Sequence, residues 1–140
     1  MRNSMLAVLL IVLGCAPAGV MAAETAGDAD ERAAIADVID IYIDGGRKGS
    51  GEIMKQAFHE GANIYSAGGG GPIQRLFDLV DSKPPANEIP YTVANLDIAG
   101  DIAMARVEID DWAGTVYTDM FTLLKTDQGW KIVSKVSYKH

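Results

Sequence analysis

Cysteine is almost absent from this chain, and other residues that carry enzyme chemistry are scarce. The 140 residues include one Cys, Cys15, and two His, His59 and His140. A single cysteine allows no internal disulfide, and we expect no thiol chemistry. No residues have zinc-ligand spacing, and no G-x-S-x-G nucleophile motif occurs. We therefore predict no metal and no cofactor, and the sequence favours a binding protein over an enzyme.

Positive charge is also in short supply. The chain has 12 Lys and Arg against 19 Asp and Glu, which gives a formal net charge of −7 at pH 7. An acidic domain is repelled by the phosphates of nucleic acids and of anionic membranes. We therefore expect no nucleic-acid partner.

One long apolar run is present, and it lies close to the N-terminus. Arg2 precedes the run Met5 to Leu13, which is too short for a stable membrane anchor, and small residues follow up to Ala23. Residues 1–23 are therefore predicted to be a bacterial export signal, cleaved after Ala22 or Ala23, and the protein to be periplasmic or secreted. Alternatively, Val12 to Cys15 resembles a lipobox, and lipidation of Cys15 would anchor the protein to a membrane.

The remainder is predicted to form a linker, residues 24–30, and one domain, residues 31–140. Asp28 and Glu31 have the spacing of a capping box, which predicts a helix start. An apolar stripe with helical spacing follows, and Gly45-Gly46 is predicted to end this helix. The residues of the stripe are Ile35, Val38, Ile39 and Tyr42.

Two more helices are predicted before the C-terminal part of the chain. Ser50 is a suitable N-cap for a short helix that runs to Phe58, and residues 62–67 are predicted to be a strand. The four glycines Gly68 to Gly71 are interpreted as a flexible connection. Pro72 is favourable at the first position of a third helix, whose apolar stripe comprises Ile73, Leu76, Phe77 and Val80.

Residues 91–140 are predicted to form four antiparallel strands. Turn sequences at Gly100-Asp101, Ala113-Gly114 and Asp127 to Gly129 separate long alternating runs. The turns predict cross-strand pairs, with a five-residue loop from Trp112 to Val116. These pairs are Ile98 with Ala103, Leu96 with Ala105, Ala94 with Val107, Val107 with Phe121, Ile109 with Asp119, Asp111 with Tyr117, Leu123 with Ile132, Phe121 with Ser134, Asp119 with Val136, and Tyr117 with Tyr138.

These pairs sort the sheet into two faces, because strand side chains alternate in direction. The inward face is predicted to be apolar and to pack on the helices. It comprises Leu96, Ile98, Ala103, Ala105, Val107, Ile109, Phe121, Leu123, Ile132 and Val136. The outward face carries Asp97, Arg106, Glu108, Asp110, Thr118, Thr122, Lys131 and Lys135.

A curved sheet with small residues on its inner face could enclose a ligand. The predicted ligand-binding residues are Tyr65, Asp111, Tyr117, Asp119 and Tyr138. Asp119 is the one acid within the apolar alternation, so it is a candidate general base or anchor for a polar ligand. Alternatively, these residues form a half-solvated rim. His59 is a second candidate base or pocket donor, or else it caps the preceding helix.

The chain resembles the nuclear transport factor 2-like superfamily, and within it the putative lumazine-binding proteins. The resemblance spans residues 33–140 and is carried by the segments YIDGGRKG, MKQAFHEGA, GGPIQRLFD, WAGTVYTDMFTLLK and GWKIVSKVSYKH. It implies an α+β fold, a cone-shaped curved antiparallel sheet packed on three helices, of the cystatin-like or nuclear transport factor 2-like type. It also implies a homodimer joined through the outer sheet face. It transfers no catalytic residue.

The sequence is consistent with three functions. The first is an exported, non-catalytic domain that holds a small molecule in the cup of the sheet. The second is an isomerase, cyclase or dehydratase that uses Asp119 as a general base. The third is a structural dimerisation module without a ligand. The sequence does not identify the ligand.

Overall fold

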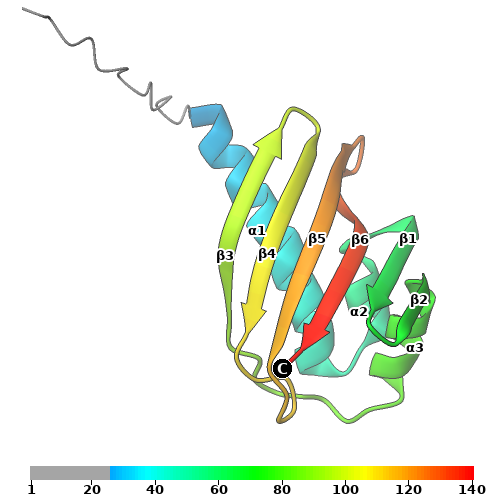
Figure 1. Ribbon diagram of the computed structural model, residues 1–140. Helices are drawn as coiled ribbons and strands as arrows, with labels where there is room; N and C mark the ends of the chain where they lie inside the picture. The colour runs from blue at the N-terminus through cyan, green and yellow to red at the C-terminus, as the bar shows by residue number, and fades with distance from the viewer. Residues whose placement is uncertain (1–25) are drawn as a thin grey trace, which may run out of the picture.

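The computed structural model describes residues 26–140 of the chain. The predicted export signal, its cleavage site and Cys15 lie outside the described residues. One long helix and two short ones lie on one side of a single sheet (Figure 1). The elements are α1 (Ala26–Lys48), α2 (Gly51–Lys55), β1 (Phe58–Ser66), β2 (Gly69–Pro72), α3 (Gln74–Asp81), β3 (Tyr91–Ala99), β4 (Ile102–Ile109), β5 (Tyr117–Thr126) and β6 (Gly129–Lys139).

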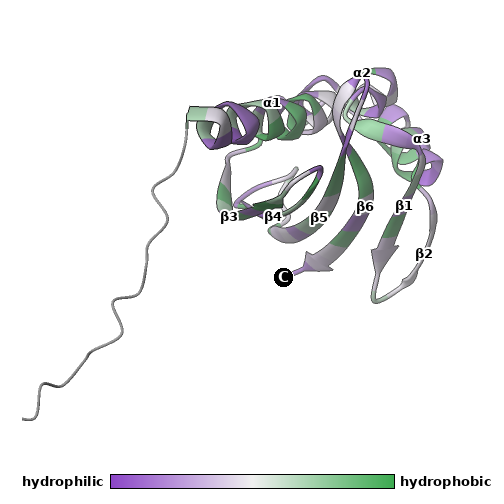
Figure 2. Cartoon of the chain, turned by 90° about the horizontal axis from the view of Figure 1, so that it is seen from above, coloured by the Kyte–Doolittle hydropathy of each residue, from purple (hydrophilic) through white to green (hydrophobic). Residues whose placement is uncertain are grey.

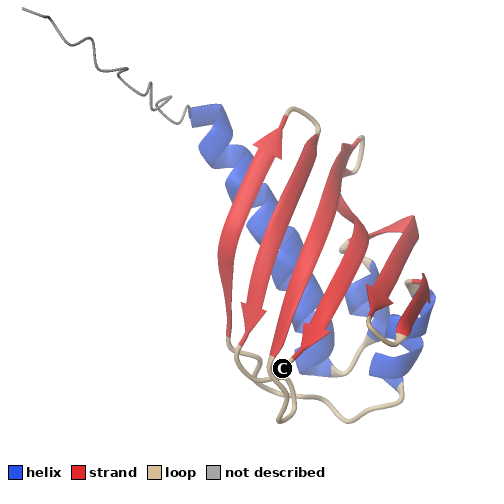
Figure 3. Ribbon diagram, viewed as in Figure 1, coloured by secondary structure: helices blue, strands red, loops and turns tan. Residues whose placement is uncertain are grey.

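The sheet has six strands in the order β2-β1-β6-β5-β4-β3. The four strands predicted over residues 91–140 are present as an antiparallel meander (Figure 3). β1 then adds to the edge of β6 in parallel orientation, and β2 pairs with β1. The sheet curves beneath the helices in Figure 2. The predicted fold class, a curved sheet packed on three helices, is confirmed, with a parallel β1–β6 pair added.

Helix α1 buries its predicted apolar stripe against the sheet. Ile35, Val38, Ile39 and Tyr42 are all buried, as expected for residues that recur on one face of a helix. Figure 2 shows this hydrophobic side of α1 turned toward the sheet. The helix begins at Ala26, so residues 26–30 are helical where the sequence predicted a linker.

The Gly45-Gly46 pair does not end α1, contrary to the prediction. The helix continues to Lys48, and Gly49 then adopts a φ of 61°. The two glycines are needed for close packing. A Cβ on Gly45 would lie 2.4 Å from the Met54 Cβ, and one on Gly46 would lie 2.2 Å from the Trp112 ring.

The segment between α2 and α3 also differs in part from the prediction. Ser50 caps α2 as predicted, since its Oγ accepts a 3.2 Å hydrogen bond from the Ile53 N–H. The glycine run is not a loose connection, because Gly69–Pro72 forms strand β2. Pro72 ends that strand, so it does not open α3, which starts at Gln74.

Two β-bulges set the register of the meander. The predicted pairs at the first and last turns are confirmed, including Ile98 with Ala103 and Leu123 with Ile132. Farther from these turns, Ala94 in β3 and Val133 in β6 are extra residues that the partner strand does not match. Such insertions leave one residue unpaired and reverse the facing of those beyond it.

The β4–β5 pairing differs from the prediction by two residues. Val107 pairs with Asp119 and Ile109 with Tyr117, because the connection is longer than the five residues expected. A shift of two keeps every side chain on its predicted face. Asp119 therefore still points inward.

The bulge at Val133 has the opposite effect, because a shift of one reverses the facing of each side chain. Phe121 pairs with Lys135 and Asp119 with Ser137. Lys135, predicted to face outward, is 5% exposed, whereas Val136, predicted to face inward, is 46% exposed. Tyr138 is also on the outer side, 62% exposed. The predicted facing of these three side chains is wrong.

The hydrophobic core lies between α1 and the concave face of the sheet. It contains the helix stripes together with the predicted inward residues of β4 and β5, such as Val107, Ile109 and Phe121. Between residues 26 and 140, no helix is both long and apolar enough to cross a membrane.

Candidate functional site

A cleft of about 670 Å³ opens between the C-terminal end of α1, α3, the segment after α3 and the β4–β5 loop. Its walls combine aliphatic and aromatic side chains with a few polar groups. Among the wall residues are Ile64, Leu76, Leu79, Val80, Pro84, Pro85, Ala86 and Trp112. Four polar residues at this site, called here the polar cluster, are Tyr42, Asp119, Lys135 and Ser137.

Asp119 is the centre of the polar cluster, and only 1% of it is exposed. Its Oδ2 accepts a 2.7 Å hydrogen bond from the Tyr42 hydroxyl. Its Oδ1 accepts a 2.6 Å hydrogen bond from the Ser137 hydroxyl and a 2.7 Å bond from Lys135 Nζ. The alternative of a half-solvated rim is therefore wrong for Asp119, which is buried and fully partnered.

The charge of Asp119 is balanced by Lys135 on the neighbouring strand. The two side chains are 1% and 6% exposed and form an ion pair. Lys135 Nζ also donates to the Ser137 hydroxyl and lies 5.7 Å from the centre of the Tyr42 ring. A buried charge pair is tolerated when further hydrogen bonds satisfy its atoms, and Ser137 and Tyr42 supply those bonds.

Tyr42 connects the polar cluster to the apolar core. The centre of its ring lies 5.2 Å from that of the Phe121 ring and 5.5 Å from that of the Trp112 ring. Burial, reinforced by the adjacent Asp119 carboxylate, raises the pKa of the Tyr42 hydroxyl well above its usual value. Tyr42 therefore remains a neutral hydrogen-bond donor to Asp119 at physiological pH.

The arrangement limits what Asp119 can do chemically. A carboxylate has about four lone-pair positions, and three hydrogen bonds from Tyr42, Ser137 and Lys135 already occupy most of them. A free general base needs an unoccupied oxygen within reach of the substrate proton. Asp119 is thus better placed to fix Lys135 and Tyr42 than to take a proton directly from a ligand.

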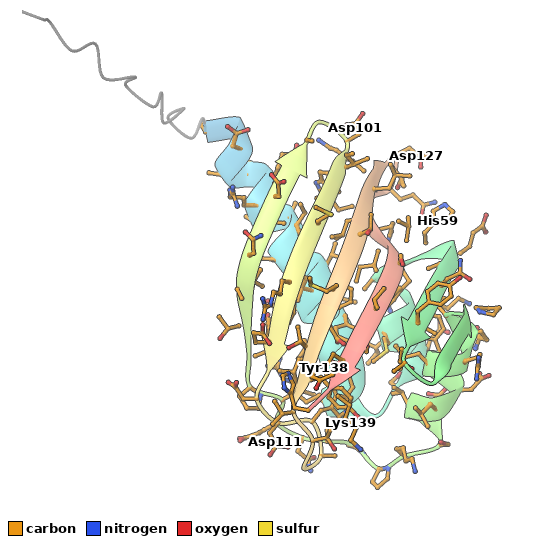
Figure 4. The ribbon with its side chains drawn as sticks, viewed as in Figure 1. His59, Asp101, Asp111, Asp127, Tyr138 and Lys139 are labelled. Atoms are coloured by element: carbon orange, nitrogen blue, oxygen red, sulfur yellow. The ribbon has the colours of Figure 1, made fainter. Side chains whose placement is uncertain are left out.

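The five residues predicted to bind a ligand do not all gather at the cleft. Asp119 and Tyr117 line it. Asp111 is exposed and accepts a 2.6 Å hydrogen bond from the Gly114 N–H within its own loop. Tyr65 and Tyr138 are 48% and 62% exposed, and neither is among the residues of the cleft wall. Figure 4 shows Asp111 and Tyr138 at the same end of the sheet as Lys139.

His59 lies at a different place from Asp119. It belongs to β1, and its Nδ1 accepts a 3.0 Å hydrogen bond from the Gly61 N–H, so it does not cap a helix. It lines a separate hollow of about 700 Å³ with Phe77, Asp127 and Lys131. In Figure 4 His59 and Asp127 lie toward the end of the molecule opposite Asp111. The fold does not bring His59 and Asp119 together.

Three members of the polar cluster were missed by sequence reasoning. Helical spacing places Tyr42 in the apolar stripe of α1, and the signal of its polar role is a hydroxyl among Ile and Val. Regular alternation places Lys135 on the outer face and gives no signal for Ser137. Nothing in the local alternation marks the bulge at Val133 that turns both inward. Within residues 26–140, no group of three or more His, Cys, Asp or Glu side chains could hold a metal ion.

The model of one protein family matches residues 30–138, nearly the whole of the described domain. That family is described as putative lumazine-binding. The chain belongs to this family. The resemblance seen in the sequence is therefore confirmed at the level of both family and fold.

Solved structures of two NTF2-like proteins share this arrangement of helices and sheet. An NTF2-like protein from Shewanella baltica OS155 is 39% identical, with a TM-score of 0.75 over 80% of this chain and 95% of that one. An NTF2-like protein from Methylobacillus flagellatus KT is 37% identical, with a TM-score of 0.75 over 79% of this chain and 93% of that one. The chain thus has the nuclear transport factor 2-like fold.

A curated relative carries the name of an enzyme. The aldolase FrzH from a Cladobotryum species is 30% identical over 104 residues, which cover 71% of this chain and 83% of the relative. A ketosteroid isomerase-like protein from Erwinia carotovora atroseptica is only 15% identical at a TM-score of 0.65. At that identity the second likeness concerns the fold alone.

Proposed function

We propose that this domain binds a small organic molecule in the cleft beside the polar cluster. The observation that carries the proposal is the combination of a buried, charge-paired Lys135 with largely apolar walls in one cleft of about 670 Å³. Small-molecule sites are typically apolar hollows of roughly 300–1,000 Å³ with a few fixed polar groups. Membership of a family described as putative lumazine-binding also supports a small ligand.

The polar cluster suggests the chemistry of the ligand. Two N–H bonds of Lys135 point to Asp119 and Ser137, which leaves a third available for an acceptor such as a carbonyl oxygen. Trp112 and Leu76 in the wall favour an apolar, flat body. A planar molecule with a carbonyl group at one end fits both features.

We favour binding without turnover, because the three hydrogen bonds to Asp119 suit an anchor better than a general base. An enzyme of the carbonyl-chemistry type, an isomerase, cyclase, dehydratase or aldolase, is the second. The aldolase-named relative favours it, as does a buried lysine held by hydrogen bonds at the wall of a cleft, since such a lysine is a common nucleophile toward carbonyl groups. Release of a product from a retained ligand would favour the enzyme.

Native mass spectrometry of the protein, purified gently from its own source, tests the proposal. We expect a retained small mass that is lost in Leu79→Trp, since Leu79 lines the cleft and is 52% exposed, so its replacement fills the opening without disturbing the core. Leu124→Trp is the matched control, because Leu124 is 37% exposed and lies outside the cleft. Equal retention in both variants would contradict binding in this cleft, and a clean mass of the protein alone would favour the structural module instead.

We further propose that the protein is exported and forms a homodimer through the outer face of the sheet. Met104, Met120 and Val136 are 61%, 51% and 46% exposed on this side, and exposed apolar patches often mark interfaces. Sedimentation as a monomer at high concentration would contradict the dimer. The mass of the processed N-terminus would distinguish cleavage near Ala23 from lipidation at Cys15.

A further inference from the structure

Lys135 occupies an unusual position for a lysine, because its charged end is enclosed in the wall of the cleft. Its side chain is 6% exposed and is held at a fixed place by Asp119 and Ser137. Lysines are rarely buried unless they are paired, and a lysine in an enclosed site is a common nucleophile toward carbonyl groups. A second lysine of the same cleft, Lys83, is exposed at its edge.

We propose that Lys135 binds its carbonyl ligand covalently, as an imine formed with an aldehyde or ketone. This inference rests on the proposed function of the cleft and adds the bond by which the ligand is held. The geometry supplies the three groups that the step requires. These are an amine at the cleft wall, a carboxylate within 2.7 Å of it and a hydroxyl in contact with both.

The first part of the reaction makes Lys135 nucleophilic. Asp119 Oδ1, which lies 2.7 Å from Nζ, takes one proton from the ammonium. The nitrogen lone pair then forms a bond to the carbonyl carbon, and the C=O π bond breaks onto oxygen. Proton transfer from nitrogen to that oxygen gives a neutral carbinolamine.

The second part expels water. The proton held by Asp119 passes to the carbinolamine oxygen through the hydroxyl of Ser137, which donates to Asp119 at 2.6 Å and accepts from Lys135. The C–O bond breaks as the nitrogen lone pair forms the C=N bond. Overall, an ammonium and a carbonyl give a protonated imine and one water, and the single positive charge is conserved.

The same site that holds the ammonium also holds the product. Asp119 regains its negative charge at the end of the sequence, so the protonated imine keeps an ion-pair partner in the enclosed site. The Tyr42 hydroxyl continues to donate to the other carboxylate oxygen, 2.7 Å away. Asp119 is therefore a positioning and proton-carrying residue, and Lys135 is the one that bonds to the ligand.

Reductive trapping tests this inference directly. The full chain is incubated with naphthaldehyde, a planar aldehyde, and cyanoborohydride, and the adduct is located by peptide mapping. We expect one adduct, on Lys135. Lys83→Met should retain it, whereas Lys135→Met should lose it. Asp119→Asn should slow its formation roughly a hundredfold or more. Circular dichroism checks that each variant is folded. Where a variant fails to fold, the map of the unaltered chain decides alone.

A second measurement separates this inference from the proposed function. Naphthalenemethanol has the same ring system without a carbonyl, and equilibrium dialysis measures the binding of both compounds without reductant. Saturable binding of both with no adduct on Lys135 would overturn the covalent bond and leave a binding cleft. Labelling spread over Lys83 and other exposed lysines would also overturn it. The absence of both binding and adduct would contradict the inference and the proposed function together.

Discussion

Lys135 Nζ lies 2.7 Å from Asp119 Oδ1, and the two side chains are 6% and 1% exposed. Removing one partner of such a pair leaves an uncompensated buried charge. We expect Lys135→Met to lower the free energy of unfolding by about 3–5 kcal/mol, measured by urea denaturation. A loss of less than about 1 kcal/mol, the value typical of an exposed pair, would show that water reaches Asp119 freely.

Removing both charges should be much less costly than removing one. Hydrophobic replacement of a whole buried ion pair is often neutral or stabilising. We therefore expect Lys135→Met combined with Asp119→Leu to recover most of the stability lost in the single variant. The double-mutant cycle measures the coupling between the two residues. Additive losses would contradict the pairing.

Tyr42→Phe should destabilise the domain without changing its packing volume much. The substitution removes the 2.7 Å hydrogen bond to Asp119 Oδ2 in a fully enclosed place, which costs about 1–3 kcal/mol. Thermal and urea unfolding measure the loss. Tyr138→Phe is the matched control, since Tyr138 is 62% exposed, and we expect it to leave the stability unchanged.

Stability should fall at alkaline pH, in part because of Tyr91. Burial, and then the hydrogen bond to Asp40, raise the pKa of Tyr91 to about 12. An unfolded tyrosine has a pKa near 10. The stabilisation that Tyr91 gives the folded state is therefore fully present below about pH 10, and it is lost as the pH rises through about 12.

Urea unfolding at a series of alkaline pH values measures this dependence. We expect the free energy of unfolding of Tyr91→Phe to fall less steeply with pH over that range than that of the unaltered chain, because the titrating hydroxyl is gone. Tyr42 contributes in the same direction, since its pKa is also raised. An identical decline in the Tyr91→Phe protein would contradict the assignment.

Deleting Val133 should remove the bulge and keep the site. Val133 is the residue of β6 that β5 does not match, so without it Ser134 still pairs with Thr122, Lys135 still pairs with Phe121, and Lys135 still faces Asp119. We expect the deletion to lower the free energy of unfolding by clearly less than the loss of about 3–5 kcal/mol expected for Lys135→Met, measured by urea denaturation. An equal loss in both variants would contradict this register. Val133→Thr keeps the chain length, and we expect it to stay within about 0.5 kcal/mol.

Much of the fold could be predicted from the sequence because its determinants are local. The stripe of α1, the Ser50 cap and the turns near Gly100 and Gly129 each depend on residues a few positions apart. The segment Gly68 to Gly71 was misread, since glycine-rich strands carry no side-chain pattern. Gly45 and Gly46 were misread because their role is close contact with Met54 and Trp112.

The candidate site was predictable only in part. The sequence by itself determined the helices, the meander, the family and the inward direction of Asp119, because each rests on periodicity or on a long stretch of residues. Only the tertiary structure decided that Lys135 and Ser137 meet Asp119 and that Tyr42 joins them from α1. One unpaired residue, Val133, reverses the facing of everything after it. Its position follows from how the whole curved sheet fits beneath the helix, which no short stretch of residues encodes.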